Sequence, residues 1–280
     1  MKLFDAHNHL QDARFAGRRE ELIAACRSAG VAGMVVNGCQ EADWPRVAAL
    51  AEAHPDLIVP SFGCHPWEAG RRTSRWEERL REWLRRFPRA GVGEIGLDRW
   101  KPDLDFAPQP ALFRRQLELA AELDRPVSIH CLRAWGMLFD LLRAGPRPRR
   151  GFLLHSYGGP LEMIVPLAKL GAWFSLPGAF ARERKIRQRA LFQAVPEDRL
   201  LIETDAPDQL LPAARVRHPL TDPATGRKLN HPANLEAVYE FAAALRDQPL
   251  PRLAARIEAN FRRLFGPLPP AEPLPPRPTD

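Results

Sequence analysis

The sequence predicts an α/β fold of the (β/α)8 TIM-barrel type, formed as a single domain with a Pro-rich C-terminal tail. Three observations predict this fold. The chain has 280 residues, and one such barrel needs roughly 250. Short apolar runs alternate with longer segments of helical periodicity, which is typical of a parallel sheet. Eight such runs occur along the chain, and eight repeats favour a closed barrel over an open sheet.

The apolar runs are the expected strands. In chain order they cover residues 2–7, 33–37, 57–63, 91–96, 126–130, 151–155, 172–175 and 200–205. The third and seventh deviate most from a strand pattern, because Pro60 interrupts one and the other is short. A doubly wound open sheet is the alternative, but no GxGxxG motif follows the first run.

The expected helices lie between these runs, where apolar residues recur at i, i+3, i+4 and i+7. They cover residues 18–30, 43–54, 75–87, 109–124, 134–145, 160–171 and 183–195, and a helical region follows near the C-terminus. Residues 206–234 are rich in Pro, Asp and Asn and predict a long functional loop after the last strand. We therefore expect one barrel domain over residues 1–266 and an extended or disordered Pro-rich tail over residues 267–280.

The composition is that of an ordinary globular protein, with 45% apolar and 27% charged residues. No apolar stretch approaches the ~20 residues that span a bilayer, and the first residues do not resemble a secretory signal. We therefore expect a cytoplasmic protein without a membrane partner, and we leave its oligomeric state open, a monomer included. The four cysteines are widely spaced, which predicts reduced thiols. The net charge of +7 favours a polyanionic partner only weakly, because arginine-rich surfaces are also common without one.

Side chains that bind metals gather at the ends of the expected strands. Barrel enzymes build their active sites at this edge. Two of the histidines are two residues apart on the first strand and therefore share a face. Any one of these histidines could be a hydrogen-bonded core residue, but all of them at strand ends predict one site. The set consists of His7, His9, Glu94, His130, His155 and Asp205.

Four imidazoles and two carboxylates are too many ligands for one tetrahedral metal, and they suit two divalent ions. Mixed nitrogen and oxygen ligands fit Zn, Mn or Mg. A carboxylate can bridge two ions ~3.5–4 Å apart, a spacing used for the hydrolysis of phosphate esters and amides. An acid beside the attacking water can take its proton, and Asp205 on the last strand is the candidate for this role.

A series of motifs in this chain resembles that of the TatD-like metal-dependent deoxyribonucleases, which belong to the amidohydrolase superfamily of (β/α)8 barrels. The motifs are FDAHNHL, GVGEIGLD, VSIHC, LLHSYGG and LLIETDAP, followed by NHPANLEAV and NFRRLFG. They occur in the same order as in that family and cover most of residues 1–266. HSYGG and IHCLRAWG are looser variants of the corresponding family segments.

The resemblance implies roles for the six residues. His7, His9 and Asp205 would hold one metal, His130 and His155 would hold the second, and Glu94 would bridge them. Many superfamily members bridge with a carboxylated lysine, but no lysine ends a strand here. The implied activity is hydrolysis of DNA phosphodiesters that depends on Mg, Mn or Zn and often starts from a 3′ end.

Further residues near strand ends are candidates for substrate contacts. His65 could touch a phosphate, and Arg133 could neutralise a phosphate oxygen. Trp67 and Tyr157 could stack on bases of a single strand. Each also has a structural alternative, as a turn histidine, a solvated arginine or a packed aromatic ring. Glu203 has the strand parity of Asp205 and is expected to lie one step deeper, where it would orient a ligand.

The sequence leaves three hypotheses for the function. The first is a two-metal hydrolase that cleaves DNA phosphodiester bonds as an exonuclease on single-stranded or frayed ends. The second keeps the site but changes the substrate to a small amide, lactone or ester. The third is a binding protein without catalysis, against which the complete set of six ligands argues.

Overall fold

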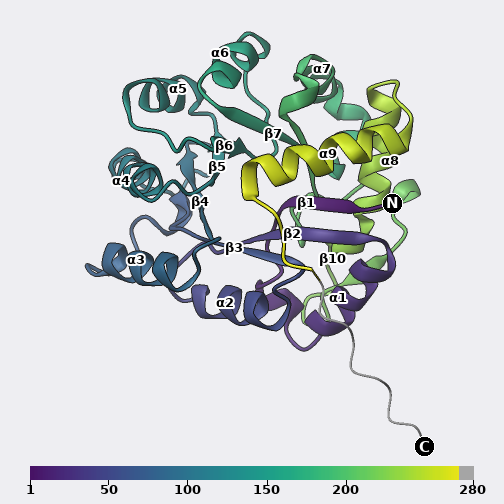
Figure 1. The fold of residues 1–280 in the computed structure, drawn as a ribbon, viewed down its shortest axis with the longest axis horizontal. Coiled ribbons are helices and arrows are strands. Elements are labelled where there is room, and N and C mark those ends of the chain that lie inside the picture. Colours follow the sequence, from purple (N-terminus) through teal and green to yellow (C-terminus); the bar gives the residue numbers. More distant parts are fainter. Residues whose placement is uncertain (271–280) are drawn as a thin grey trace, which may run out of the picture.

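The computed structural model describes residues 1–270, which form a ring of eight parallel strands (Figure 1). Each strand pairs with the next along the chain, in the order β1 to β8. The strands are β1 (Leu3–Asn8), β2 (Val31–Asn37), β3 (Ile58–Phe62), β4 (Gly91–Asp98), β5 (Val127–Leu132), β6 (Phe152–Leu154), β7 (Ala172–Pro177) and β8 (Leu200–Glu203). The predicted barrel is confirmed.

Helices follow the strands in alternation and surround the ring (Figure 1). They are α1 (Arg19–Ser28), α2 (Trp44–Ala53), α3 (Trp76–Arg86), α4 (Gln109–Glu122), α5 (Trp135–Ala144), α6 (Ile164–Lys169), α7 (Ile186–Ala194), α8 (Leu235–Leu245) and α9 (Leu250–Phe265). α6 and α7 begin later than expected, because short 3-10 turns at Leu161–Met163 and Glu183–Lys185 precede them. None of the helices over residues 1–270 has the length and apolar character needed to cross a bilayer.

The ring closes where the end of β8 meets the end of β1. The backbone N–H of Asp205 donates to His7 O at 2.9 Å, and the N–H of His9 donates to Ala206 O at 2.8 Å. These two bonds join residues about 200 positions apart in the sequence. Closure therefore brings the FDAHNHL and LLIETDAP motifs to the same edge of the barrel.

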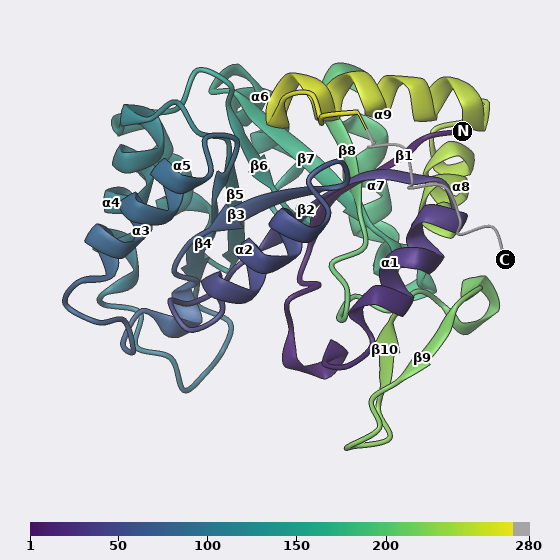
Figure 2. The ribbon, with the colours of Figure 1, turned by 60° about the horizontal axis from the view of Figure 1, so that its bottom comes forward.

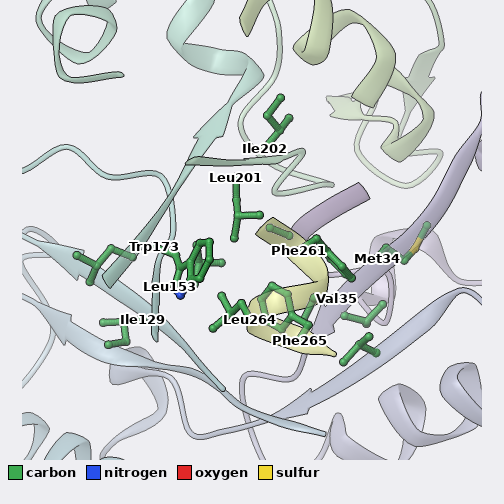
Figure 3. Packing of buried hydrophobic residues seen from close by; sticks show 14 of the residues in the cluster. Met34, Val35, Ile129, Leu153, Trp173, Leu201, Ile202, Phe261, Leu264 and Phe265 are labelled. Atoms are coloured by element: carbon green, nitrogen blue, oxygen red, sulfur yellow. The ribbon is translucent and has the colours of Figure 1, made fainter. Parts of the chain in front are cut away.

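Helix α9 covers the opposite end of the barrel, away from the loop that follows β8 (Figure 2). Its apolar side chains Phe261, Leu264 and Phe265 lie among strand residues such as Leu153 and Leu201 (Figure 3). The ring of Phe261 packs 4.9 Å from that of Phe4, and the amide of Asn260 donates to Leu200 O at 2.8 Å. This end of the barrel is therefore a packed apolar core.

A Phe261→Ala variant is expected to lose about 3–5 kcal/mol of unfolding free energy, because a fully buried aromatic ring leaves a cavity between α9 and β1. Urea denaturation measures this loss. Arg256→Ala, at an exposed position of the same helix, is the matched control and should change stability by less than about 0.5 kcal/mol. Equal losses in the two variants would contradict the assigned packing of α9.

One detail of the predicted strands needs correction. The third run is a strand, as predicted, and Pro60 is accommodated because the pairing with β4 begins only at Ser61. The short strand is β6, with three residues, and β7 has six and extends to Pro177. The prediction that the seventh strand is the short one was therefore wrong.

Residues 206–234 form a long segment, as expected, but part of it is regular. β9 (Pro219–Thr221) and β10 (Lys228–Asn230) pair antiparallel, with the buried Leu220 and Leu229 opposite each other. The resulting hairpin projects from the end of the molecule that is opposite α9 (Figure 2). The expectation of a loop without strands was wrong here, because these two leucines supply a small apolar contact of their own.

The structure also describes the first residues of the predicted tail. The segment after Gly266 is described through Pro270, and Leu268 packs against the hydrophobic core. Leu268 is therefore packed against the barrel, whereas Pro267, Pro269 and Pro270 are exposed. The other tail residues, 271–280, lie outside the described residues.

His231 makes the stability of this segment depend on pH. Burial, reinforced by the nearby His218, lowers its pKa to about 4, and its Nδ1 accepts from Ala233 N–H at 3.0 Å. The folded protein thus keeps this imidazole neutral, whereas the unfolded chain protonates near pH 6.5. Stability should fall as the pH drops from about 6.5 to 4.

His231→Asn is expected to reduce this loss, because the amide oxygen of asparagine can accept in place of Nδ1 and does not protonate. Between pH 7.5 and 4.5 the variant should lose about 2 kcal/mol less than the parent protein in urea denaturation. His54→Asn, at the C-terminal end of α2, controls for removal of an imidazole. A pH profile for His231→Asn that runs parallel to the parent would contradict the assignment.

Candidate active site

The two histidines of the first motif converge on one oxygen of Glu94. The Nε2 atoms of His7 and His9 are 3.2 Å apart and lie 3.3 and 3.2 Å from Glu94 Oε2. Oδ1 of Asp205 lies 3.6 Å from the first of these nitrogens and 3.4 Å from the second. The predicted shared face of the two histidines is therefore observed.

The second oxygen of Glu94 faces a separate group of histidines. Its Oε1 lies 2.8 Å from His155 Nε2, 3.2 Å from His130 Nδ1 and 3.3 Å from His65 Nε2. Glu94 thus stands between two sets of imidazoles, with one oxygen directed at each. His65 belongs to this cluster, although the sequence pointed to it only as a substrate contact.

The backbone around Glu94 depends on glycine. Gly96 has a φ of +149°, and a Cβ on it would lie 1.9 Å from His130 O. A Cβ on Gly93 would lie 2.8 Å from that of Ser128. The GVGEIG run therefore lets β4 approach β5 closely enough to place Glu94 beside His130.

The buried carboxylates of the site are held in their charged form. Burial alone would raise the pKa of Glu94, but the imidazoles of His155, His65 and His7 bring it well below its usual range. Burial likewise opposes ionisation of Asp205, and its hydrogen bond to His9 with the charges of the neighbouring imidazoles lowers its pKa. Burial lowers the pKa of His7, which favours a neutral imidazole.

The outer nitrogens of two imidazoles indicate how the cluster suits a metal. His9 Nδ1 lies 2.8 Å from Asn37 O, and His130 Nε2 lies 3.0 Å from Asp98 Oδ2. Both partners can only accept, so in the neutral imidazoles these nitrogens carry the proton and the inner nitrogens present lone pairs. Lone pairs that converge on a carboxylate repel it unless the imidazoles are protonated or a metal cation lies between them. The donor set therefore fits divalent metal ions.

The cluster forms the floor of a cavity of about 610 Å³. Its wall includes Arg14, Arg46, Trp67, Trp100, Lys185 and Gln209, from segments far apart in the sequence. His9, His65, Glu94, His130, His155 and Asp205 all line this one cavity. A substrate that enters it reaches the two faces of Glu94 directly.

Some of the predicted substrate contacts reach the cavity and others do not. Trp67 is 38% exposed at the cavity wall, and its Nε1 donates to Asp98 Oδ2 at 2.6 Å. Arg133 follows β5 at the surface and is not part of the cavity wall. Tyr157 is fully buried between Trp135 and Phe174, and its hydroxyl donates to Pro160 O at 2.7 Å. Tyr157 has no free face for a base, so its predicted stacking role does not fit.

Glu203 lies below the cluster, as its strand parity predicts. It is fully buried and accepts hydrogen bonds from Ser156, at 2.5 Å, and from Ser175. Its Oε1 is 3.8 Å from His155 Nδ1. Asp205, in contrast, lies past the end of β8 with a φ of +51°, so the strand parity does not set its direction.

Sequence reasoning did not single out Asp98, which lies at the end of β4 against His130. Its position four residues after Glu94 on the same strand, a spacing that keeps one face, was the available signal. Asp5, on the same strand as His7, accepts from His7 N–H and from Thr204 N–H at 3.2 and 3.0 Å. It therefore ties the end of β1 to the segment before Asp205.

The barrel and the cluster at the ends of its strands define a class: this is a metal-dependent hydrolase. The chain belongs to the TatD related DNase family, whose sequence profile matches residues 4–266.

Two curated relatives are both named 3′-5′ ssDNA/RNA exonuclease TatD. The one from Erwinia tasmaniensis is 32% identical over 269 residues, covering 94% of this chain and all of the relative. The one from Edwardsiella piscicida is 33% identical over 264 residues, covering 94% and 99%.

Solved structures agree with this assignment. The TatD homologue YjjV of Escherichia coli superposes with a TM-score of 0.84 at 28% identity, covering 94% of this chain and 97% of that one. A TatD family hydrolase from Entamoeba histolytica has a TM-score of 0.81 at 16% identity, covering 95% and 99%, and shows the shared fold.

Proposed function

We propose that this chain is a two-metal exonuclease that hydrolyses phosphodiester bonds at single-stranded or frayed DNA ends. The observation that carries the proposal is Glu94, whose two oxygens face different sets of imidazoles. His7, His9 and Asp205 would hold one ion, and His130 and His155 would hold the other, with Glu94 between them. His65 lies against the second set and would hold the same ion or a phosphate oxygen.

When bound, the ions would supply an acidified water and neutralise charge on the phosphate. The residues of the chain would do the rest. Asp205 is ionised and lies at the cavity floor, so it can accept the proton of the attacking water at Oδ1. Asn37 and Asp98 hold the imidazoles of His9 and His130 in orientation through their outer nitrogens.

The charge of the cavity wall supports a polyanionic substrate. Arg46 and Lys185 line the cavity and form no ion pair with a carboxylate among the described residues. Arg14, on the same wall, is neutralised by Asp12 and Asp208 at 2.8 Å each. Two cations therefore remain available for backbone phosphates.

The exposed aromatic rings support a single strand with unpaired bases. Trp67 and Trp100 line the cavity and are 38% and 54% exposed. Base stacking on such rings is tolerant of sequence and needs unpaired bases. The relatives named ssDNA/RNA exonucleases agree with this substrate class.

The test is metal removal followed by a DNA digest. Protein reloaded with Mg, Mn or Zn should shorten an end-labelled single strand, and EDTA should abolish this activity because every predicted ligand would lose its ion. Restoration by added metal is the control for damage. Turnover of a panel of small esters, lactones and amides without any DNA cleavage would contradict the proposal and favour a small-molecule hydrolase.

A further inference from the structure

Asp98 joins the candidate metal centre to the aromatic wall of the cavity. Its Oδ2 accepts from His130 Nε2 at 3.0 Å and from Trp67 Nε1 at 2.6 Å. Its Oδ1 accepts from the backbone N–H groups of Trp100 and Lys101 at 2.7 and 3.1 Å. The carboxylate is 1% exposed and thus satisfies four donors at one buried point.

We propose that Asp98 is a positioning residue that fixes the metal-facing nitrogen of His130 and the indole of Trp67 together, so that a nucleobase stacked on the indole is held in register with the phosphate at the centre. This inference rests on the proposed function for the identity of the substrate. Asp98 is not among the six predicted ligands, although it ends the GVGEIGLD motif.

The orientation of His130 follows from the acceptor chemistry of Asp98. An ionised carboxylate can only accept, so the neutral imidazole carries its proton on Nε2 and presents the lone pair of Nδ1. That lone pair points at Glu94 Oε1, 3.2 Å away, where the second ion would lie. Without Asp98 the ring is free to adopt the other tautomer or to turn.

The orientation of Trp67 follows from the same oxygen. Its N–H edge is tied to Asp98 at the buried end, and the rest of the ring reaches the cavity wall. His65 packs edge-on against the ring with centroids 5.0 Å apart. Lys101 Nζ lies 4.0 Å from the ring centroid, so a cation packs against the same ring.

The backbone of Asp98 is also held in place. Its N–H donates to Gln109 Oε1 at 2.8 Å, and Gln109 Nε2 donates back to Asp98 O at 3.2 Å. Gln109 itself is fully buried at the start of α4. The carboxylate therefore has little freedom to follow either partner, which is what a positioning role requires.

Asparagine has the same shape as aspartate but cannot replace it here. All four partners of Asp98 are donors, and an amide offers one accepting oxygen and one donating NH2 group. Whichever way the amide turns, its NH2 group meets two donors. Asp98→Asn therefore breaks the bonds to His130 and Trp67, or those to the backbone, at nearly unchanged volume.

The first measurement is metal affinity of the full chain, by chelator competition with Zn or Mn. Asp98→Asn should bind the ion that His130 would hold about 10–100-fold less tightly than the parent protein. This loss is expected when the outer hydrogen-bond partner of a ligating histidine is removed. Asp103→Asn, an exposed aspartate in the loop that follows, is the matched control and should bind within twofold. Affinity of Asp98→Asn within twofold of the parent would overturn the proposal.

The second measurement isolates Trp67 by fluorescence. The emission of Trp67 is obtained by subtracting the emission spectrum of the protein that carries Trp67→Ala from the spectrum of the same protein with Trp67. In the Asp98→Asn background this difference spectrum should shift to longer wavelength and be quenched more by iodide, because the indole loses its buried partner. An unchanged spectrum would overturn the coupling of Trp67 to Asp98, whether or not DNA is cleaved.

The third measurement uses single-stranded DNA with and without a base at the end being cleaved. Trp67→Ala should raise KM at least about fivefold for the normal end and leave the abasic end unchanged. Asp98→Asn should raise the same KM and also lower kcat. Equal KM values for Asp98→Asn and the parent would overturn the substrate part of the inference. A parent protein that cuts neither DNA overturns the proposed function instead, and the two earlier measurements then decide whether Asp98 positions His130 and Trp67.

Discussion

A Glu94→Gln variant is expected to lose at least about 10³-fold in kcat/KM and to bind fewer than two metal ions per chain. The substitution keeps the size of the side chain and removes its charge. Glu94 is 2% exposed and is the one carboxylate among the described residues whose oxygens face both sets of imidazoles. An amide would direct its NH2 group at one of the sets, where lone pairs are expected, and so disfavour an ion there.

Metal analysis of the purified variant and an end-labelled DNA digest measure this result together. Glu68→Gln is the matched control, since Glu68 lines the same cavity outside the cluster. It should retain both metals and most of the activity. Tight binding of two ions by Glu94→Gln would show that Glu94 does not bridge them, even if activity falls.

The Asp205→Asn variant is expected to lower kcat by about 10²–10⁴-fold, the usual contribution of a general base. Asparagine suits this position, because Asp205 has a φ of +51° and Asn adopts this backbone region more readily than most residues. The backbone N–H bond to His7 O would remain. The loss should therefore report the missing negative charge and not a disturbed loop.

Rates at saturating single-stranded DNA measure the loss in kcat, and the melting temperature of the variant measures folding. Asp208→Asn is the matched control from the same loop: Asp208 is exposed, its carboxylate pairs with Arg14, and it is not one of the cluster residues. A rate for Asp205→Asn within tenfold of the parent would remove Asp205 as the proton acceptor. Loss of folding in Asp205→Asn alone would assign it a structural role.

The two ends of the barrel differ in function: one end stabilises the fold and the other carries the site. At the α9 end, Phe261 and its neighbours form an apolar plug whose loss should cost stability. At the other end, charged residues such as Glu94 and Asp205 are buried against imidazoles. Burial of ionised groups is costly unless they are paired, and this arrangement is expected for a site that a metal completes.

Much of the fold could be predicted because the relevant signals are local. The alternation of apolar runs with helical segments located all eight strands of the barrel, and two-residue periodicity placed His7 and His9 on one face. The errors occurred where local patterns are short. β6 has three residues, and the hairpin β9–β10 depends on only two buried leucines.

The substrate contacts were harder to predict than the ligands. Tyr157 and Trp67 both follow strands and look alike in sequence, yet one is buried and the other reaches the cavity. Their exposure depends on which rings happen to pack beside them, such as Trp135 beside Tyr157. That packing arises between segments and leaves no periodic trace in the chain.

The sequence by itself determined the barrel, the edge that carries the site and the six residues brought together there, because strand periodicity fixes which side chains end at that edge. Only the tertiary structure decided which of those residues face each of the two oxygens of Glu94. Closure of β8 onto β1 sets Asp205 against His7, and the turn after β3 adds His65 to the cluster. Asp98 gained its partners in the same way, since His130 and Trp67 come from other strands and loops. Distances between separate strands depend on the closed ring, and no local pattern encodes them.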